Sequence, residues 1–90
     1  MGAVAERISR KLHDGLSPAS LEVRDDSARH AGHAGAREGG ESHFDVRMVA
    51  AAFEGLSRLE RQRLVNTLLA EELAGPVHAL SLKLQAPSET

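Results

Sequence analysis

Histidines carry most of the metal-binding chemistry that this sequence offers. His30 and His33 form a His-x-x-His pair in a glycine-rich stretch, and His43 and His78 each stand at the start of an alternating apolar stretch. Neutral imidazole is a good ligand for iron, zinc and nickel. The chain has no cysteine, so it cannot on its own supply the thiolates of a zinc ribbon or of an all-cysteine iron–sulfur centre. A site built from this chain alone would be a histidine site for zinc or nickel.

The length and charge of the chain exclude several other classes of function. Its 90 residues fit one small domain. With 11 basic and 13 acidic residues, the net charge of −2 gives no strong overall attraction to nucleic acid. Two phenylalanines, without tryptophan or tyrosine, supply little stacking surface for single-stranded bases. There is no cysteine nucleophile, Gly-x-Ser-x-Gly elbow or Walker loop, so we expect no enzymatic activity.

Membrane and targeting patterns are also missing from the sequence. No apolar run approaches the roughly 18 residues that a membrane span needs. The N-terminal stretch carries Glu6 and Asp14 and lacks the uninterrupted apolar run of a signal peptide. We therefore expect a chain without membrane partners, in the bacterial cytoplasm or, in a eukaryote, in the matrix of a mitochondrion or another organelle.

The spacing of apolar residues predicts the elements that must position the histidines. Apolar residues every four positions indicate an amphipathic helix at the N-terminus, ended by Gly15. Ser57, with Glu60 three positions later, is a capping box for a long helix that Gly75 ends. Short alternating stretches indicate strands. The predicted order is an N-terminal helix that ends at Gly15, strands over 20–24 and 43–48 joined by a hairpin loop, a helix over 58–74, alone or after one short helical turn, and a strand over 79–84.

This order of elements predicts an α+β fold. A three-stranded sheet with its helices on one face satisfies it, and a crossover between parallel strands is right-handed. If the third strand lies beside the second, both begin at the end of the sheet where the hairpin loop lies. That arrangement gathers His30, His33, His43 and His78 at one end of a mixed sheet. The predicted organisation is one domain over 1–87, a flexible hairpin loop over 25–41 and a short polar tail over 88–90.

Each histidine also has an interpretation that involves no metal. His78 has the parity of the leucines in the last strand, which predicts the helix-covered face, where a backbone carbonyl could satisfy it. His43 has the opposite parity within its own strand and is expected to be structural or at the surface. His30 and His33 are either solvated loop residues or ligands that become ordered in a complex. His13 lies near the C-terminal end of the first helix, where a positive charge is mildly favourable.

Several stretches of the sequence are similar to the BolA family. The resemblance covers nearly the whole chain, from the first helix to Pro87, and the His-Ala-Leu motif combined with the Phe-x-Gly-x-Ser turn is specific. At the start of the long helix the family usually has Arg-His-Arg, whereas this chain has Gln62 in the middle position. The similar stretches are Glu41-Ser42-His43-Phe44, Phe53-Glu54-Gly55-Leu56-Ser57, Arg61-Gln62-Arg63-Leu64-Val65-Asn66 and Val77-His78-Ala79-Leu80-Ser81-Leu82.

The resemblance implies a fold similar to the class II KH domain and a partnership with monothiol glutaredoxins. Such pairs share a [2Fe-2S] cluster, to which the glutaredoxin contributes a cysteine and glutathione a second thiolate. The remaining ligands would be His78, from the His-Ala-Leu motif, and a histidine of the hairpin loop, for which His30 fits best and His33 competes. No cluster is expected on the isolated chain. The implied function is an adaptor in iron–sulfur cluster trafficking or in iron and redox sensing.

A second implied function is that of a DNA-binding transcriptional regulator of stress response and cell morphology. Arginines near the start of the long helix could form a basic patch, although an ordinary solvated face balanced by neighbouring glutamates explains them equally well. On an acidic domain they predict weak, salt-sensitive contact. KH domains grip the nucleic-acid backbone with a Gly-x-x-Gly loop, and the corresponding turn over 55–58 lacks the second glycine. The candidate residues are Arg47, Arg58, Arg61 and Arg63.

Overall fold

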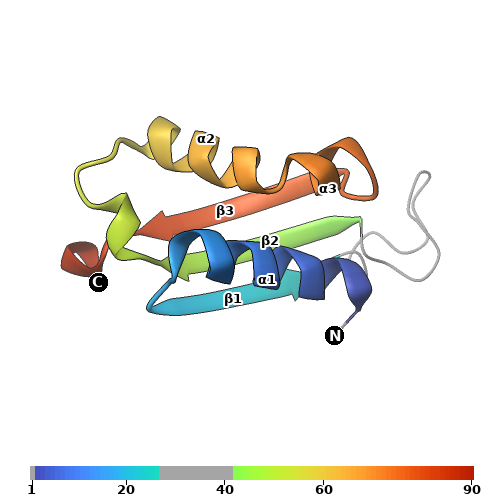
Figure 1. Cartoon of the computed structure of the whole chain (residues 1–90), viewed down its shortest axis with the longest axis horizontal. Coiled ribbons are helices and arrows are strands. Elements are labelled where there is room, and N and C mark those ends of the chain that lie inside the picture. Colours follow the sequence, from blue (N-terminus) through green and yellow to red (C-terminus); the bar gives the residue numbers. More distant parts are fainter. Residues whose placement is uncertain (1, 27–41) are drawn as a thin grey trace.

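The structure, a computed structural model, describes residues 2–26 and 42–90. Helices and strands occupy most of this part of the chain (Figure 1). They are α1 (Ala3–Leu16), β1 (Ser20–Asp25), β2 (His43–Val49), the 3-10 turn η2 (Ala51–Phe53), α2 (Arg58–Leu68), α3 (Ala70–Ala74), β3 (Ala79–Gln85) and the 3-10 turn η3 (Pro87–Glu89). Strand β1 runs through Asp25, one residue beyond the predicted strand, and the rest of the predicted hairpin loop after Asp26 lies outside the described residues.

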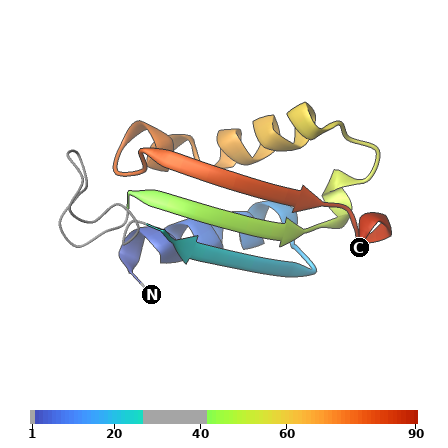
Figure 2. The same cartoon turned by 180° about the vertical axis from the view of Figure 1, so that it is seen from behind.

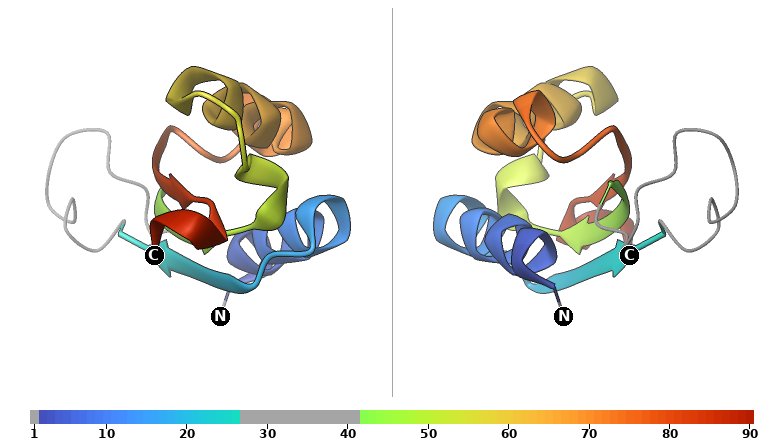
Figure 3. Two further views of the ribbon diagram at one scale, coloured as in Figure 1. Left: turned by 90° about the vertical axis from the view of Figure 1, so that its left-hand side faces the viewer. Right: turned by 90° about the vertical axis from the view of Figure 1, so that its right-hand side faces the viewer.

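The three strands form one mixed sheet in the order β1-β2-β3. Strand β2 is central: it pairs antiparallel with β1, where Val23 lies opposite Val46, and parallel with β3, where His43 lies opposite Ala79. The helices cover one face of the sheet, and the view from behind shows the other face without a helix (Figures 1 and 2). The end-on views show the same two-layer arrangement (Figure 3). The predicted α+β fold with a mixed three-stranded sheet is therefore confirmed.

The hydrophobic core lies between the helices and the covered face of the sheet. Alternate residues of β2 point into it, and the residues between them are partly or fully exposed, as the period of a half-buried strand requires. The apolar stripe of α1 meets this layer, with Ile8 and Leu12 completely buried. Val65 of α2 and Leu69, between α2 and α3, fill the remaining space. The β2 residues of the core are Phe44, Val46 and Met48.

The sequence predicts that the first helix ends at Gly15, but the structure differs. The helix continues to Leu16, and Ser17 adopts the left-handed conformation, with φ of 43°, and donates its backbone N–H to the His13 carbonyl at 3.0 Å. Gly15 has a different role, because a Cβ placed on it would lie 2.9 Å from both Cδ atoms of Leu68. The glycine therefore allows α1 and α2 to approach each other closely.

The predicted long helix is divided in two at Leu69. Its start is as expected: the Ser57 hydroxyl accepts from the Glu60 backbone N–H at 3.1 Å, and the Glu60 carboxylate accepts from the Ser57 N–H at 2.8 Å. Leu69 departs from helical geometry, with φ of −104° and ψ of 20°. Just before it, the Thr67 hydroxyl donates to the Arg63 carbonyl one turn back, at 2.9 Å, a bond that commonly bends helices. The break separates α2 from α3.

The C-terminal residues pack as part of the fold. Residues 88–90, predicted as a polar tail, follow Pro87 into the single turn η3 and its cap. Ala86, immediately before this turn, is buried, and the Ser88 hydroxyl donates to the Glu54 carboxylate at 2.7 Å. Among the described residues, no helix has the length and apolar character to span a membrane.

Candidate functional site

The strongest sequence candidate, His78, lies at the end of the sheet where β2 and β3 both begin. Its backbone N–H donates to the Ser42 carbonyl at 2.7 Å, which fixes it beside the start of β2. Its side chain is exposed. The ring stacks on the ring of His43, with 6.4 Å between ring centroids and 15° between ring planes. The topology therefore brings together two of the histidines that the sequence places at one end of the sheet.

The predicted orientation of His78 is wrong. Its parity with Leu80 predicts the helix-covered face, but β3 begins only at Ala79, and strand alternation does not extend to a residue before the strand. The partner of its ring, His43, belongs to the face that carries no helix, since Phe44 next to it points into the core. The His78 imidazole is consequently open to solvent beside His43.

The two stacked histidines differ in how their ring nitrogens are engaged. Nδ1 of His43 lies 2.8 Å from the hydroxyl of Ser42, a residue that is almost fully buried. Within residues 2–26 and 42–90, the His78 ring makes no hydrogen bond. A metal ligand needs an accessible nitrogen lone pair, and His78 meets that requirement. His43, whose Nδ1 is already engaged by Ser42, is a poorer candidate ligand than His78.

The loop candidates His30 and His33 lie outside the described residues. The two points where their segment joins the fold are described. Asp26 donates its backbone N–H to the His43 carbonyl at 2.7 Å, and Ser42 accepts from the His78 N–H. The segment therefore leaves and re-enters the sheet at the end that carries His78. Which of the two histidines is a ligand stays a prediction.

The described residues do not make a self-contained metal site. In the parts of the chain that the structure describes, no group of three or more His, Cys, Asp or Glu side chains could hold an ion. His78 with His43 could contribute at most two ligands, and one of them is already bonded to Ser42. Any metal or cluster bound here would need further ligands from residues 27–41 or from another molecule.

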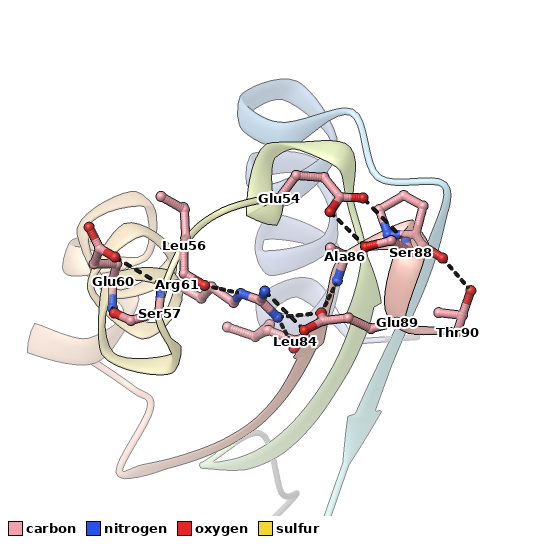
Figure 4. Close-up of polar contacts among 11 residues, drawn as sticks. Glu54, Leu56, Ser57, Glu60, Arg61, Leu84, Ala86, Ser88, Glu89 and Thr90 are labelled. Carbon is pink, nitrogen blue, oxygen red and sulfur yellow. Dashed lines mark hydrogen bonds and ion pairs between the residues drawn. The ribbon is translucent and has the colours of Figure 1, made fainter.

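The structure removes Arg61 from the predicted basic patch. Arg61 is only 8% exposed and donates to the backbone carbonyls of Leu56, at 3.1 Å, and Leu84, at 3.2 Å. Its guanidinium also grips the Glu89 carboxylate through two bonds, of 2.6 and 3.2 Å (Figure 4). It lies over the Phe53 ring, 5.9 Å from the centroid. Arg61 therefore binds the C-terminal turn to α2 and is not presented to DNA.

The other three arginines do not form a single patch. Arg47 lies on the helix-free face of the sheet, near the carboxylates of Asp45 and Glu22 at 3.6 and 4.0 Å. Arg58 and Arg63 are exposed on α2, which covers the opposite face (Figure 3). Nucleic-acid binding requires clustered positive charge, so the geometry gives the DNA-binding hypothesis little support. That hypothesis stays a prediction.

One buried charge was not anticipated from the sequence. Glu72 of α3 is completely buried and binds Arg7, at 2.9 Å, and Lys11, at 2.9 Å, both on α1. Burial by itself would raise the pKa of Glu72, but hydrogen bonds from Lys11, the backbone and Arg7 outweigh it and hold the pKa below its ordinary value. Sequence reasoning missed this ion pair because the partners are more than sixty positions apart.

Comparison with known proteins identifies the family. The sequence pattern of the family described as BolA-like protein matches residues 12–89. Over 89 residues the chain is 47% identical to BolA-like protein 1 of Homo sapiens, an alignment that covers 99% of this chain and 62% of that protein. The chain therefore belongs to the BolA-like family, which confirms the resemblance seen in its motifs. It spans less than two thirds of the length of this relative.

Solved structures of the same family share the fold. The BolA domain of SufE1 from Arabidopsis thaliana matches with a TM-score of 0.90 and 43% identity, covering 100% of this chain and 99% of that one. The solution structure of BolA1 from Mus musculus matches with a TM-score of 0.82 and 44% identity, covering 99% of this chain and 69% of that one. The agreement extends over the whole arrangement of helices and sheet.

Proposed function

We propose that this chain is an adaptor that binds a monothiol glutaredoxin and helps to ligate a [2Fe-2S] cluster bridging the two proteins. The observation that carries the proposal is the state of His78: it is exposed at the start of β3, and its ring makes no hydrogen bond within the described residues. It stands in the His-Ala-Leu motif through which the chain resembles its family. Such a side chain fits a cluster that the chain shares with a partner.

The cluster is cargo in this proposal, and its thiolate ligands come from outside the chain. The glutaredoxin would contribute a cysteine and glutathione a second thiolate, while this chain would contribute His78 and one loop histidine, His30 or, in competition with it, His33. Histidine ligation raises the reduction potential of a [2Fe-2S] cluster relative to thiolate ligation. It also makes binding sensitive to pH, because the imidazole must be neutral to bind iron. Both properties suit transfer or sensing better than permanent storage.

The surrounding residues would prepare His78 for this role. The bond from its backbone N–H to the Ser42 carbonyl holds it at the end of the sheet, and the stacked ring of His43 limits how the imidazole can turn. His43 is in turn held by the Ser42 hydroxyl. Residues that contact a metal ligand and fix its orientation commonly tune the affinity of that ligand for the metal. Ser42 and His43 are therefore positioning residues in this proposal.

The proposal is tested by mixing the chain with cluster-loaded monothiol glutaredoxin and recording visible circular dichroism. Binding through His78 should change the cluster bands, and His78→Ala should abolish that change. His13→Ala, an exposed histidine on α1, is the matched control and should behave like the wild type. His30→Ala and His33→Ala then identify the second ligand. A spectrum that does not change, or that His78→Ala leaves the same as wild type, would contradict the ligand assignment.

The compartment of the protein also stays a prediction. The sequence predicts the bacterial cytoplasm or the matrix of a mitochondrion or another organelle. A relative that is 44% identical over 93 residues is named SufE-like protein 1, chloroplastic/mitochondrial, from Arabidopsis thaliana, and this chain covers 25% of it. Cell fractionation of the source organism, with the full-length protein followed by antibody, would decide between the compartments.

A further inference from the structure

Strand β3 leaves one backbone edge of the sheet open. It is the outer strand and pairs only with β2 among the described residues (Figure 2). The bonds from Ala79 N–H to Ser42 and from Ala50 N–H to the Gln85 carbonyl show that odd-numbered residues of β3 direct their backbone groups at β2. Those of Leu80 and Leu82 therefore point outward, and they have no partner within the described residues. An open edge of this kind is a template for another strand.

A groove runs along this open edge, between β3 and α2. Its volume is about 240 Å³. The floor is apolar, because the leucines of β3 that lie half-buried under the helix line it. The rim is polar and positively charged, with Gln62 and Arg58 on the helix side and Lys83 on the strand side. The lining residues are Arg58, Arg61, Gln62, Leu80, Leu82, Lys83 and Leu84.

The charges of this groove are unequally neutralised. Arg61 is paired with Glu89 at 2.6 Å, and its Nη1 atom also donates to the Leu84 carbonyl. The outward carbonyl of Leu84, at the C-terminal end of the edge, therefore already has a partner. Arg58 and Lys83 are exposed and form no ion pair within residues 2–26 and 42–90. Two uncompensated cations thus flank an apolar floor and a free strand edge. The complementary ligand is anionic, apolar and able to pair its own backbone.

We propose that the groove between α2 and β3 binds an extended acidic peptide segment of a partner protein, which adds to the sheet as a fourth strand beside β3. The backbone of the segment would bond to the outward groups of Leu80 and Leu82, its apolar side chains would cover the leucine floor, and its carboxylates would meet Arg58 and Lys83. Main-chain pairing supplies affinity in this mode, and alternate side chains supply specificity. The groove begins at Leu80, two residues after His78, and does not include His78, so the proposal does not depend on cluster ligation.

A peptide fits this groove better than a nucleic acid does. Single-stranded bases bind by stacking on aromatic side chains, and none of the lining residues is aromatic. A nucleotide backbone also has no regular donors and acceptors at strand spacing, whereas the open edge of β3 offers them. The cation that lies deepest in the groove, Arg61, is already neutralised by Glu89. These features favour main-chain recognition over phosphate recognition.

The test uses an eight-residue capped peptide of alternating glutamate and valine, with binding measured by fluorescence anisotropy and by amide NMR shifts of the whole chain. Arg58→Glu and Lys83→Glu should each weaken binding about twofold to fivefold, as expected for exposed ion pairs. Arg63→Glu is the matched control, because Arg63 is an exposed α2 arginine that does not line the groove. The amide signals of Leu80 and Leu82 should shift on binding. Thermal unfolding by circular dichroism checks that each variant is folded.

Two N-methylated versions of the peptide test the main-chain pairing directly. One carries methyl groups on the odd amides and the other on the even amides, so the side chains are unchanged. Pairing with β3 requires that one pattern abolishes binding and the other preserves it. Equal binding of both overturns the proposal, as does a shift confined to residues away from β3. Two other outcomes also overturn the proposal. If a single-stranded oligonucleotide binds and the peptide does not, the groove binds nucleic acid. If the chain forms a dimer that Lys83→Glu dissociates in sedimentation equilibrium, the groove binds a second copy of the chain.

Discussion

Two residues show how far a side chain's role depends on its surroundings. Arg61 stands in the polar first turn of α2, between Glu60 and Gln62, and its sequence context predicts a solvated cation. In the fold it is buried, with Glu89, 28 positions away, as its counter-ion. The parity of His78 with the leucines of β3 predicts a strand residue on the helix-covered face, but His78 precedes β3 and is exposed. Both differences arise from contacts that no local pattern encodes.

Replacing Arg61 should destabilise the fold markedly. Arg61→Met leaves the Leu56 and Leu84 carbonyls without their side-chain donor, at a cost of about 1–3 kcal/mol in the free energy of unfolding. It also leaves Glu89 bonded, within the described residues, only by the Ala86 N–H. Arg58→Met, an exposed change in the same turn, should alter that free energy by less than about 0.5 kcal/mol. Urea unfolding followed by circular dichroism measures both. Equal effects would mean that the buried contacts contribute nothing beyond helix propensity.

At the scale of elements, local patterns predicted most boundaries, and packing shifted a few. The capping box at Ser57 and the alternation of β2 are satisfied by residues within a few positions, so their signals are local and reliable. The end of α1 is different, because Gly15 serves the contact with Leu68 and leaves the left-handed cap to Ser17. A glycine near a helix end can adopt the left-handed cap or make room for a neighbouring side chain. Only the packing of the neighbouring helix shows which role it has.

The contact between α1 and α2 predicts an unusual response to Gly15→Ala. Alanine stabilises a helix interior by about 1 kcal/mol relative to glycine, and by less near a helix end, where Gly15 lies. Here the new Cβ would meet Leu68 at 2.9 Å, so the leucine must move and most of that gain should be lost. In a Leu68→Ala background, the same change should recover the full gain. A double-mutant cycle by urea unfolding measures the coupling, and additive effects would rule out the steric explanation.

At the scale of the whole molecule, ion pairs with one buried partner join elements that are distant in sequence. Glu72 ties α3 to Arg7 and Lys11 of α1, and Glu89 ties the C-terminal turn to Arg61 of α2. Charge therefore adds to apolar contact between α1 and α3, and between α2 and the C-terminal turn. Removing one partner of a buried pair is costly, because it leaves the other charge uncompensated.

The Glu72 cluster predicts a pH-dependent stability. The pKa of Glu72 in the fold lies below the ordinary value of 4.5, so ionisation favours the folded state. This contribution is fully present above pH 4.5 and is lost as the pH falls through the lower folded-state pKa. Glu72→Gln should therefore lower the free energy of unfolding by about 1–3 kcal/mol at neutral pH, through weaker hydrogen bonds to Arg7 and Lys11, and by progressively less in acid. Urea unfolding over a pH series measures the difference.

The matched control for Glu72→Gln is the neighbouring carboxylate. Glu71 bonds to Lys11 at 3.1 Å but its side chain is 81% exposed, so Glu71→Gln should cost less than about 0.5 kcal/mol at any pH. A penalty for Glu72→Gln that stays constant from neutral to acidic pH would show that packing, and not ionisation, accounts for the role of Glu72.

The sequence by itself determined the order of elements and indicated the family, because periodicity, capping and motif spacing are local properties of the chain. It placed His43 and His78 at one end of the sheet on the condition that β3 lies beside β2, and the structure shows that pairing. Only the tertiary structure decided which charged residues are buried and which edge of the sheet stays open. Those outcomes depend on partners dozens of positions away, such as Glu89 for Arg61, and on the side of β3 that no strand covers.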